Sequence, residues 1–384
     1  MRILFLTPFL PHPAATHGGG SYVGALAEGL RQHAELGLVH LRHRTEEQLP
    51  PDTWSWHASA NYQGSAGGLG HRLRMLWRWR SRPLLAAKYW QPELGALIKQ
   101  ARADFQPDIA LVEMAQMAQY LPYLRGLPTI LTDHEAGRPA NRQTGLGEAA
   151  DQRDDRLWTD FVVRYYSQAS AVQAVTQEDA DVLATRLNLT VTVRPPTIAI
   201  PAPTARAAQT PPHALFLGDY RHGPNPEAAT KLAERLWPLV RAKVPDAELL
   251  LAGPNDEPIR GLDQLPGVRV LGFVPDLGEL FGSVRVVLSP LWSGGGFRVK
   301  SATALAHGLP IITNELGSRG CLAPEPACSV GESMQELCDA TVRHLTDQEH
   351  ANAAGKLART WASEQYAADA VAQLQLQRIR EVLD

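Results

Sequence analysis

A run of glycines followed by two cationic side chains is the strongest chemical signal in the sequence. Gly294, Gly295 and Gly296 precede Arg298 and Lys300, and a helix is expected over residues 301–307. Glycine lets backbone amides approach an anion closely, and the start of a helix adds roughly half a positive charge. Cationic side chains add charge-assisted hydrogen bonds. The pattern predicts a loop that holds a diphosphate, and the alternative is a structural turn.

A second glycine run lies near the N-terminus, between an apolar run at 2–6 and an expected helix. Gly18, Gly19 and Gly20 are predicted to form a loop that faces an anion, with a flexible turn as the alternative. The dinucleotide fingerprint G-x-G-x-x-G is not met, because Val23 takes the place of its third glycine and no acidic residue ends the apolar run at 37–41. A nicotinamide cofactor is therefore disfavoured.

His134 is the candidate acid, base or sugar contact. It follows the apolar run at 129–131 within the sequence Thr132-Asp133-His134-Glu135, where a parallel strand is expected to end. An imidazole at that place can donate to a sugar or move a proton. The alternative is a histidine on a surface loop.

The sequence contains no pattern that is typical of metal ligands or of a catalytic nucleophile. Asp179-Ala180-Asp181 has acidic metal-site spacing, but it falls in an expected helix after Thr176, where acids in the first turn offset the helix dipole. The three cysteines, Cys321, Cys328 and Cys338, match neither a zinc pattern nor a disulfide framework, so we expect them reduced and buried. No cofactor is predicted.

Two domains must position these loops. Short apolar runs alternate with helical stretches, which predicts buried parallel strands at 2–6, 37–41, 108–112, 129–131, 169–175, 214–217, 248–252, 268–273, 285–289 and 310–313. A proline-rich stretch at 195–212 interrupts the alternation. We therefore expect an α/β protein with two Rossmann-like, doubly wound parallel sheets facing a cleft, with ligands at the carboxyl ends of the strands. After the break, Asn225 is expected to cap a helix that runs to about Lys243.

The expected boundaries are an acceptor-side domain at 1–200, a nucleotide-sugar-binding domain at 201–363, and a helix at 364–384 that returns to the first domain. The composition, 44% hydrophobic and 20% charged with net charge −3, excludes a disordered chain and a general nucleic-acid binder. No apolar run reaches the ~18 residues of a membrane span, and Pro8, Pro11 and Pro13 break the apolar start. We expect a cytoplasmic protein.

A basic and aromatic segment lies at 53–92, which contains six cationic and no acidic residues. We predict membrane or acceptor contact, because tryptophan favours the bilayer interface and arginine favours anionic lipid. The residues chosen for this contact are Arg74, Trp77, Arg78, Trp79 and Arg80. Anionic glycan binding is one alternative, and the other is packing of Leu73, Leu76 and Trp77 against the core.

Several short motifs resemble the GT-B glycosyltransferases of family 4, the group 1 glycosyl transferases. They are LFLGDY at 215–220, GPN at 223–225, LLAG at 250–253, GFVPD at 272–276, GGGFRVK at 294–300 and ALAHGLPII at 304–312. The resemblance implies a retaining, metal-independent enzyme of hexosyltransferase type. Such an enzyme moves a sugar from a nucleoside diphosphate sugar to a glycan, a lipid-linked acceptor or a small molecule.

The resemblance also implies roles for individual residues. Arg298 and Lys300 would hold the diphosphate, Phe273 and Val274 would contact the nucleobase, and His134 would lie near the reacting carbon. The other donor-binding residues would be Gly18, Gly19, Gly20, Gly218, Arg221, Gly294, Gly295, Gly296, Phe297 and Thr303.

The sequence departs from the family pattern at two places. Asp219 and Pro224 stand where relatives carry an arginine and a lysine, and Gly295 and Thr303 stand where they carry two glutamates. Two other functions therefore stay open, a non-catalytic nucleotide-sugar-binding partner protein and a GT-B sugar-nucleotide epimerase.

Overall fold

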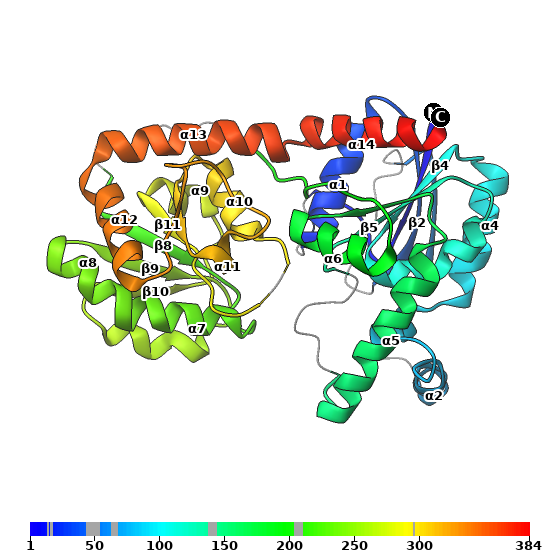
Figure 1. The fold of residues 1–384 in the computed structure, drawn as a ribbon, viewed down its shortest axis with the longest axis horizontal. Coiled ribbons are helices and arrows are strands. Elements are labelled where there is room, and N and C mark those ends of the chain that lie inside the picture. The colour runs from blue at the N-terminus through cyan, green and yellow to red at the C-terminus, as the bar shows by residue number, and fades with distance from the viewer. Residues whose placement is uncertain are drawn as a thin grey trace. The chain divides into compact units, whose positions relative to one another are not determined.

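The computed structural model describes residues 1–13, 15, 18–43, 54–62, 68–136, 144–202, 210–294 and 296–384. It divides into two compact units (Figure 1). The first comprises residues 1–197 and 368–384, and the second comprises residues 198–367. Each unit is a parallel β-sheet with helices packed against it.

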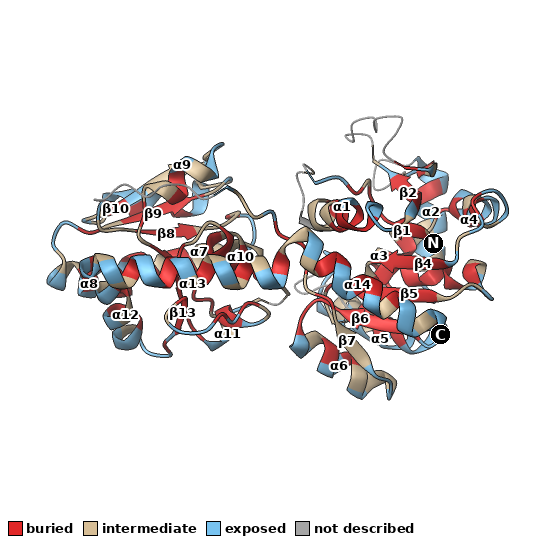
Figure 2. Ribbon diagram, turned by 90° about the horizontal axis from the view of Figure 1, so that it is seen from above, coloured by how far each residue is buried: buried red, intermediate tan, exposed pale blue. Residues whose placement is uncertain are grey.

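The first unit contains a sheet of seven parallel strands in the order β3-β2-β1-β4-β5-β6-β7. The strands are β1 Arg2–Thr7, β2 Glu35–Arg42, β3 Trp56–Asn61, β4 Ile109–Glu113, β5 Thr129–Asp133, β6 Ala171–Ala174 and β7 Val191–Val193. The helices are α1 Gly18–Arg31, α2 Leu69–Arg78, α3 Leu84–Tyr89, α4 Pro92–Asp104, η2 Ala115–Leu124, α5 Glu148–Tyr166, α6 Gln177–Leu187 and α14 Ala368–Leu383. Strands β4 and β5 are buried along their whole length, which is why they appear as continuous apolar runs (Figure 2).

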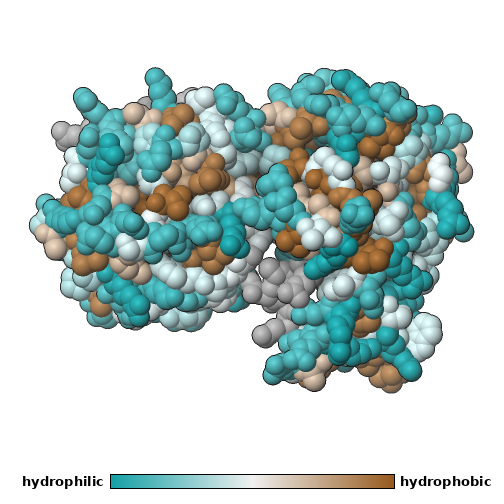
Figure 3. All heavy atoms as spheres, in the orientation of Figure 1, coloured by the Kyte–Doolittle hydropathy of each residue, from teal (hydrophilic) through white to brown (hydrophobic). Residues whose placement is uncertain are grey.

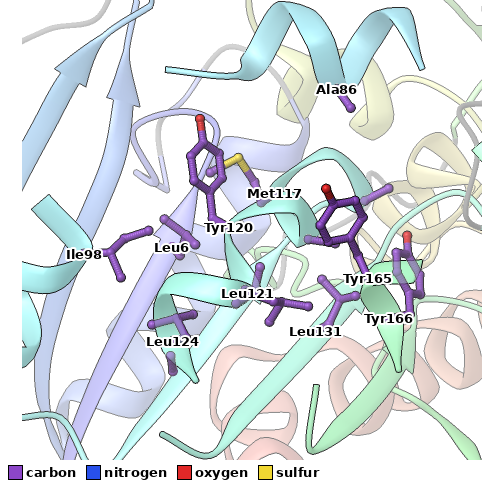
Figure 4. Packing of buried hydrophobic residues seen from close by; sticks show 14 of the residues in the cluster. Leu6, Ala86, Ile98, Met117, Tyr120, Leu121, Leu124, Leu131, Tyr165 and Tyr166 are labelled. Carbon is purple, nitrogen blue, oxygen red and sulfur yellow. The ribbon is translucent and has the colours of Figure 1, made fainter. Parts of the chain in front are cut away.

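A large apolar core packs one face of this sheet against η2, α4 and α5. Leu131 of β5 and Tyr165 of α5 belong to it together with Met117 and Tyr120 of η2 (Figure 4). Tyr120 also accepts a hydrogen bond from the Gln91 amide and donates one to the Tyr89 carbonyl. The core therefore also fixes the chain that follows α3.

The C-terminal helix α14 packs on α1 within the first unit. Gly29 of α1 makes room for it, because a Cβ there would lie 2.8 Å from the Ala368 carbonyl oxygen and 2.8 Å from the Ala372 Cβ. Val371 and Ile379 of α14 are buried in the same core as Leu26. The last helix thus completes the first unit.

The second unit contains six parallel strands in the order β10-β9-β8-β11-β12-β13. The strands are β8 His213–Leu217, β9 Glu248–Ala252, β10 Val268–Gly272, β11 Val286–Leu288, β12 Ile311–Thr313 and β13 Cys328–Val330. The helices are α7 Pro224–Lys231, η3 Leu232–Leu236, α8 Trp237–Lys243, η4 Glu257–Gln264, α9 Leu277–Gly282, α10 Val299–Ala306, α11 Glu315–Ser318, α12 Met334–Thr346 and α13 Gln348–Tyr366. The three cysteines are free and buried, as expected.

The expected class of two parallel α/β sheets is confirmed. That they face one cleft stays a prediction. Three short strands, β3, β7 and β13, were not predicted. Two local predictions were wrong. Gly18 to Gly20 form the first turn of α1 and not a loop, and α7 begins at Pro224 with Gly223 as its cap, so that Asn225 is not the capping residue.

Candidate functional site

In the second unit, the loops after β8, β9 and β10 are joined backbone to backbone. The Gly218 amide donates to the Ala252 carbonyl at 3.1 Å, and the Gly253 amide donates to the Gly272 carbonyl at 2.8 Å. Gly253 has a φ of +141°, and a Cβ there would lie 1.8 Å from the Gly218 carbonyl oxygen. Only glycine permits this crossing, which holds the carboxyl ends of three strands together.

Lys300 lies at the start of α10 and is connected to the loop after β8 through Asn225. Its ammonium donates to the Asn225 Oδ1 at 3.2 Å and lies 4.1 Å from the centre of the Phe216 ring. Asn225 in turn donates to the Asp219 carbonyl at 2.9 Å, and Gly218 leaves space for its side chain. Among the described residues, no carboxylate forms an ion pair with Lys300.

Burial, together with a smaller effect of the neighbouring Arg298 charge, lowers the pKa of Lys300 from 10.5 to about 7. An anion placed beside this ammonium would supply the missing counter-charge and raise that pKa again. We call Gly218, Asn225, Gly294, Gly296 and Lys300 the glycine-loop site.

The glycine loop itself has the backbone that its sequence predicts. Gly294 and Gly296 have φ of +95° and +78°, in the left-handed region that favours glycine, while Gly295 lies outside the described residues. Before the loop, the Ser293 hydroxyl donates to the Glu227 carboxylate at 2.8 Å. No side chain caps the start of α10, but the Val299 amide donates to the Phe297 carbonyl and the Ser301 amide to the Arg298 carbonyl. Of its first three amides, that of Lys300 has no hydrogen bond among the described residues and can receive an anion.

Arg298 makes its described hydrogen bonds to backbone carbonyls of the second unit. Its guanidinium is buried and donates to the Leu316 carbonyl at 2.9 Å, so that it connects the glycine loop to α11. Positioning this loop is the function that its contacts show. Direct contact of Arg298 with a diphosphate stays a prediction.

The other expected donor residues lie in varied surroundings. The Phe273 ring is 71% exposed just after β10, and Val274 packs on the core beside it. Phe297 packs edge-on against Tyr366 at 5.5 Å. The Thr303 hydroxyl donates to the Val299 carbonyl at 2.9 Å, within α10. Arg221 is exposed and pairs with Asp219 at 2.9 Å.

In the first unit, His134 lies in a buried cluster and not on a surface loop. Its Nε2 lies 2.9 Å from the Glu113 Oε2, and Arg194 donates two hydrogen bonds to the same carboxylate at 2.8 and 2.7 Å. Burial alone would raise the pKa of Glu113, but the Arg194 charge and the His134 hydrogen bond outweigh it and lower that pKa to about 2. We call Glu113, His134 and Arg194 the histidine cluster.

The histidine cluster leaves one imidazole nitrogen without a partner. The Nδ1 of His134 is buried and has no hydrogen-bond partner in the part of the chain that the structure describes, while the ring stacks on Tyr22 of α1 with centroids 6.0 Å apart. Because the ionised Glu113 only accepts, a neutral His134 donates from Nε2 and keeps a lone pair on Nδ1. The imidazole is therefore held as a hydrogen-bond acceptor or base.

Neighbouring contacts fix the loops around this histidine. Tyr166 donates to the Asp133 carboxylate at 2.6 Å, directly before His134. Met114 follows Glu113 with a φ of +77°, and its Cε lies 2.5 Å from where a Cβ of Gly19 would be. A side chain at position 19 would displace the flexible end of Met114, and an anion contact at Gly18, Gly19 or Gly20 stays a prediction.

Comparison with known proteins identifies the class of molecule. Residues 211–347 match the family model of Glycosyl transferases group 1. Sucrose-phosphate synthase from Thermosynechococcus elongatus has a similar structure, with a TM-score of 0.71 at 17% identity over 100% of this chain and 99% of that chain. The chain carries a group 1 glycosyltransferase domain and has the GT-B fold.

Two further structures resemble the chain over nearly its whole length. HepE of Anabaena, in complex with UDP and glucose, has a TM-score of 0.62 at 14% identity and covers 99% of this chain and 100% of its own. A trehalose-6-phosphate structure from E. coli, bound with UDP-2-fluoro glucose, has a TM-score of 0.64 at 10% identity and covers 99% of both chains. No curated protein matches the sequence.

Within the described part of the chain, no three His, Cys, Asp or Glu side chains come together as a metal site. Asp179 and Asp181 lie in α6, whose first turn is capped by the Thr176 hydroxyl accepting from the Asp179 amide. The predicted helix at this acidic pair is therefore confirmed.

The basic and aromatic segment at 53–92 contains both packed and exposed residues. Trp54 is buried, and Trp90 stacks on Tyr120 at 5.0 Å. Trp79 donates to the Asp154 carboxylate at 2.7 Å, and the guanidinium of Arg78 lies 5.7 Å from the Trp90 ring. These contacts pack Arg78 and Trp79 partly into the unit, and their contact with a membrane or an acceptor stays a prediction.

The other residues of the segment are on the surface. Arg74, Trp77 and Arg80 are exposed, and so are Leu73 and Leu76. Packing of Leu73, Leu76 and Trp77 against the core, the alternative considered for this segment, is therefore wrong.

Glu113 and Arg194 were not predicted from the sequence as residues of the site. Glu113 ends the apolar run of β4, and an acidic residue at that place indicates a buried carboxylate that needs a partner. Asn225 was found but was assigned to the wrong task, since it connects Lys300 to the loop after β8.

Proposed function

We propose that the protein is a retaining, metal-independent hexosyltransferase that uses a UDP-sugar and a glycan, lipid-linked or small-molecule acceptor in the cytoplasm. The observation that carries the donor assignment is Lys300, a buried ammonium at the start of α10, just after the glycine loop, that pairs with no carboxylate among the described residues. HepE in complex with UDP and glucose supports uracil as the base.

The chemistry follows from charge. As the bond from the sugar to the diphosphate breaks, negative charge grows on the leaving group, and the sugar becomes oxocarbenium-like. The Lys300 ammonium and the Lys300 amide at the start of α10 would stabilise that negative charge. Neither a protein nucleophile nor a metal ion is required for this stabilisation.

His134 would act on the acceptor or on the sugar. Its Nε2 is held by Glu113, so the basic Nδ1 is the atom that can accept a proton or a sugar hydroxyl hydrogen bond. Glu113 and Arg194 act through His134 and are positioning residues.

One observation favours a second function, a non-catalytic nucleotide-sugar-binding partner. Thr303, at the place of a glutamate in relatives, directs its hydroxyl to the Val299 carbonyl within its own helix. A protein with this residue would bind the donor with one polar contact fewer.

The deciding experiment measures both binding and turnover. Thermal shifts with UDP, GDP, ADP and dTDP identify the base, since a ligand at 100 times its Kd stabilises the fold by about 2.7 kcal/mol. Purified protein is then incubated with the UDP-sugars, and hydrolysis or transfer is followed. Nucleotide binding without either reaction supports the binding partner, and conversion of the donor sugar without acceptor supports an epimerase.

A further inference from the structure

Helix α2 directs an apolar stripe to solvent. Leu69 and Trp77 are 75% and 71% exposed, and Leu73 and Leu76 are also exposed. These positions, spaced by four, three and one residues, lie on one helical face. An amphipathic helix on a protein surface usually directs that face inward, and α2 does the opposite.

The inner face and C-terminal end of α2 are held in place by the rest of the unit. His71 is buried, and Met75 is half-buried one turn later. Just beyond the helix, Trp79 donates to Asp154, and the Arg153 guanidinium donates to the Trp79 carbonyl at 3.0 Å. The outward stripe is thus fixed by contacts on the opposite face.

All charged side chains on α2 and directly after its end are positive. Arg74 and Arg80 are exposed, and no acidic residue occurs anywhere at 53–92. Helix α5 nearby does carry exposed acids, among them Glu148 and Asp155. Attraction to an anionic surface is therefore limited to α2, and the apolar stripe must contribute most of any binding.

We propose that α2 is a docking helix for anionic lipid bilayers. It would lie in the interface with Leu73, Leu76 and Trp77 among the acyl chains and with Arg74 and Arg80 at the lipid phosphates. A protein partner fits less well, because a ten-residue helix supplies far fewer than the roughly 20–30 residues of a standard protein interface. Figure 3 shows hydrophobic residues among hydrophilic ones where Figure 1 places α2.

Co-sedimentation of the full chain with vesicles tests the proposal. The wild type should sediment with phosphatidylcholine vesicles that contain phosphatidylglycerol, and poorly with phosphatidylcholine alone. Leu73→Ala with Trp77→Ala should lower partitioning by about a hundredfold, since two large apolar side chains are lost from the interface. Arg74→Gln with Arg80→Gln should lower it by about tenfold or more and remove the salt dependence.

Matched variants separate insertion from general surface effects. Leu189→Ala and Arg125→Gln change an exposed leucine and an exposed arginine elsewhere in the same unit and should leave partitioning unchanged. A second readout uses Leu73→Cys labelled with a polarity-sensitive dye, because the three native cysteines are buried. Its emission should shift to the blue on anionic vesicles.

Three results would overturn the proposal: no sedimentation of the wild type at low salt, wild-type partitioning of the Leu73 and Trp77 double variant, or a concentration-dependent dimer that this variant abolishes. The last result would assign the stripe to a second copy of the chain. None of these measurements uses a donor sugar, so failure of docking leaves the proposed transferase activity standing, and loss of that activity leaves docking standing.

Discussion

The histidine cluster and the glycine-loop site are both polar groups set at the carboxyl ends of parallel strands, but they are satisfied to different degrees. In the histidine cluster, the Glu113 carboxylate receives hydrogen bonds from Arg194 and His134. In the glycine-loop site, Lys300 contacts only an amide oxygen and an aromatic ring. A completed ion pair holds a side chain in place, whereas an ammonium without a counter-charge is prepared to receive an anion.

The largest effect is expected from a change of Glu113, the carboxylate of the histidine cluster. Glu113→Ala should lower the free energy of unfolding by about 3–5 kcal/mol, because it leaves the Arg194 charge buried without its partner. Urea denaturation measures this loss. The double variant Glu113→Leu with Arg194→Met should recover most of it, and equal stability of the single variant and the wild type would show that the cluster does not hold the fold.

His134→Ala should reduce transfer about a hundredfold and change UDP affinity less than twofold. The reason is that the imidazole belongs to the first unit, while the proposed diphosphate contacts belong to the second. Steady-state kinetics and calorimetry on one preparation give the two numbers. His33→Ala, which changes an exposed histidine of the same unit, is the control, and wild-type turnover of His134→Ala would remove the catalytic assignment.

Lys300→Met should weaken UDP binding by about 1.5–3 kcal/mol, the range for a hydrogen bond to a charged group. The same change should leave stability unchanged or raise it, since a buried charge without a carboxylate partner is removed. Calorimetry and urea denaturation measure the two effects, with the exposed Lys356→Met as control. Equal losses of UDP and uridine affinity would contradict a phosphate contact.

Stability and UDP binding should both depend on pH through Lys300. Its pKa is about 7 in the folded protein, against 10.5 for an ordinary lysine. Between these two values the unfolded chain binds more protons than the folded chain, so the Lys300 contribution to stability rises with pH across that window and is flat below it. UDP binding at pH 8 should take up close to one proton, because the diphosphate restores the charged form. Calorimetry in buffers of different ionisation enthalpy detects this uptake, which should vanish in Lys300→Met.

The smallest expected effect is that of Arg221→Ala. Its ion pair with Asp219 is exposed and should contribute little to stability, and UDP affinity should change less than twofold. A tenfold loss of UDP affinity would return Arg221 to the donor site.

The sequence by itself determined the two parallel sheets and the glycine loop. Strand β9 was predicted at its observed bounds, Glu248–Ala252, because a strand buried on both faces needs a continuous apolar run. The positive φ values at Gly294 and Gly296 likewise follow from residues adjacent in the chain, since glycine adopts them at no steric cost. Where local chemistry decides the structure, local sequence was sufficient.

Only the tertiary structure decided which distant side chains meet and which face of a helix is covered. Glu113 and Arg194 are 81 positions apart, and strand order alone brings them together. Helix α2 has the same apolar period whether Leu73 and Trp77 face the core or solvent, and the contacts of His71 and Trp79 on the other side turn them outward. Periodicity specifies a face, but packing against the rest of the chain decides where that face points.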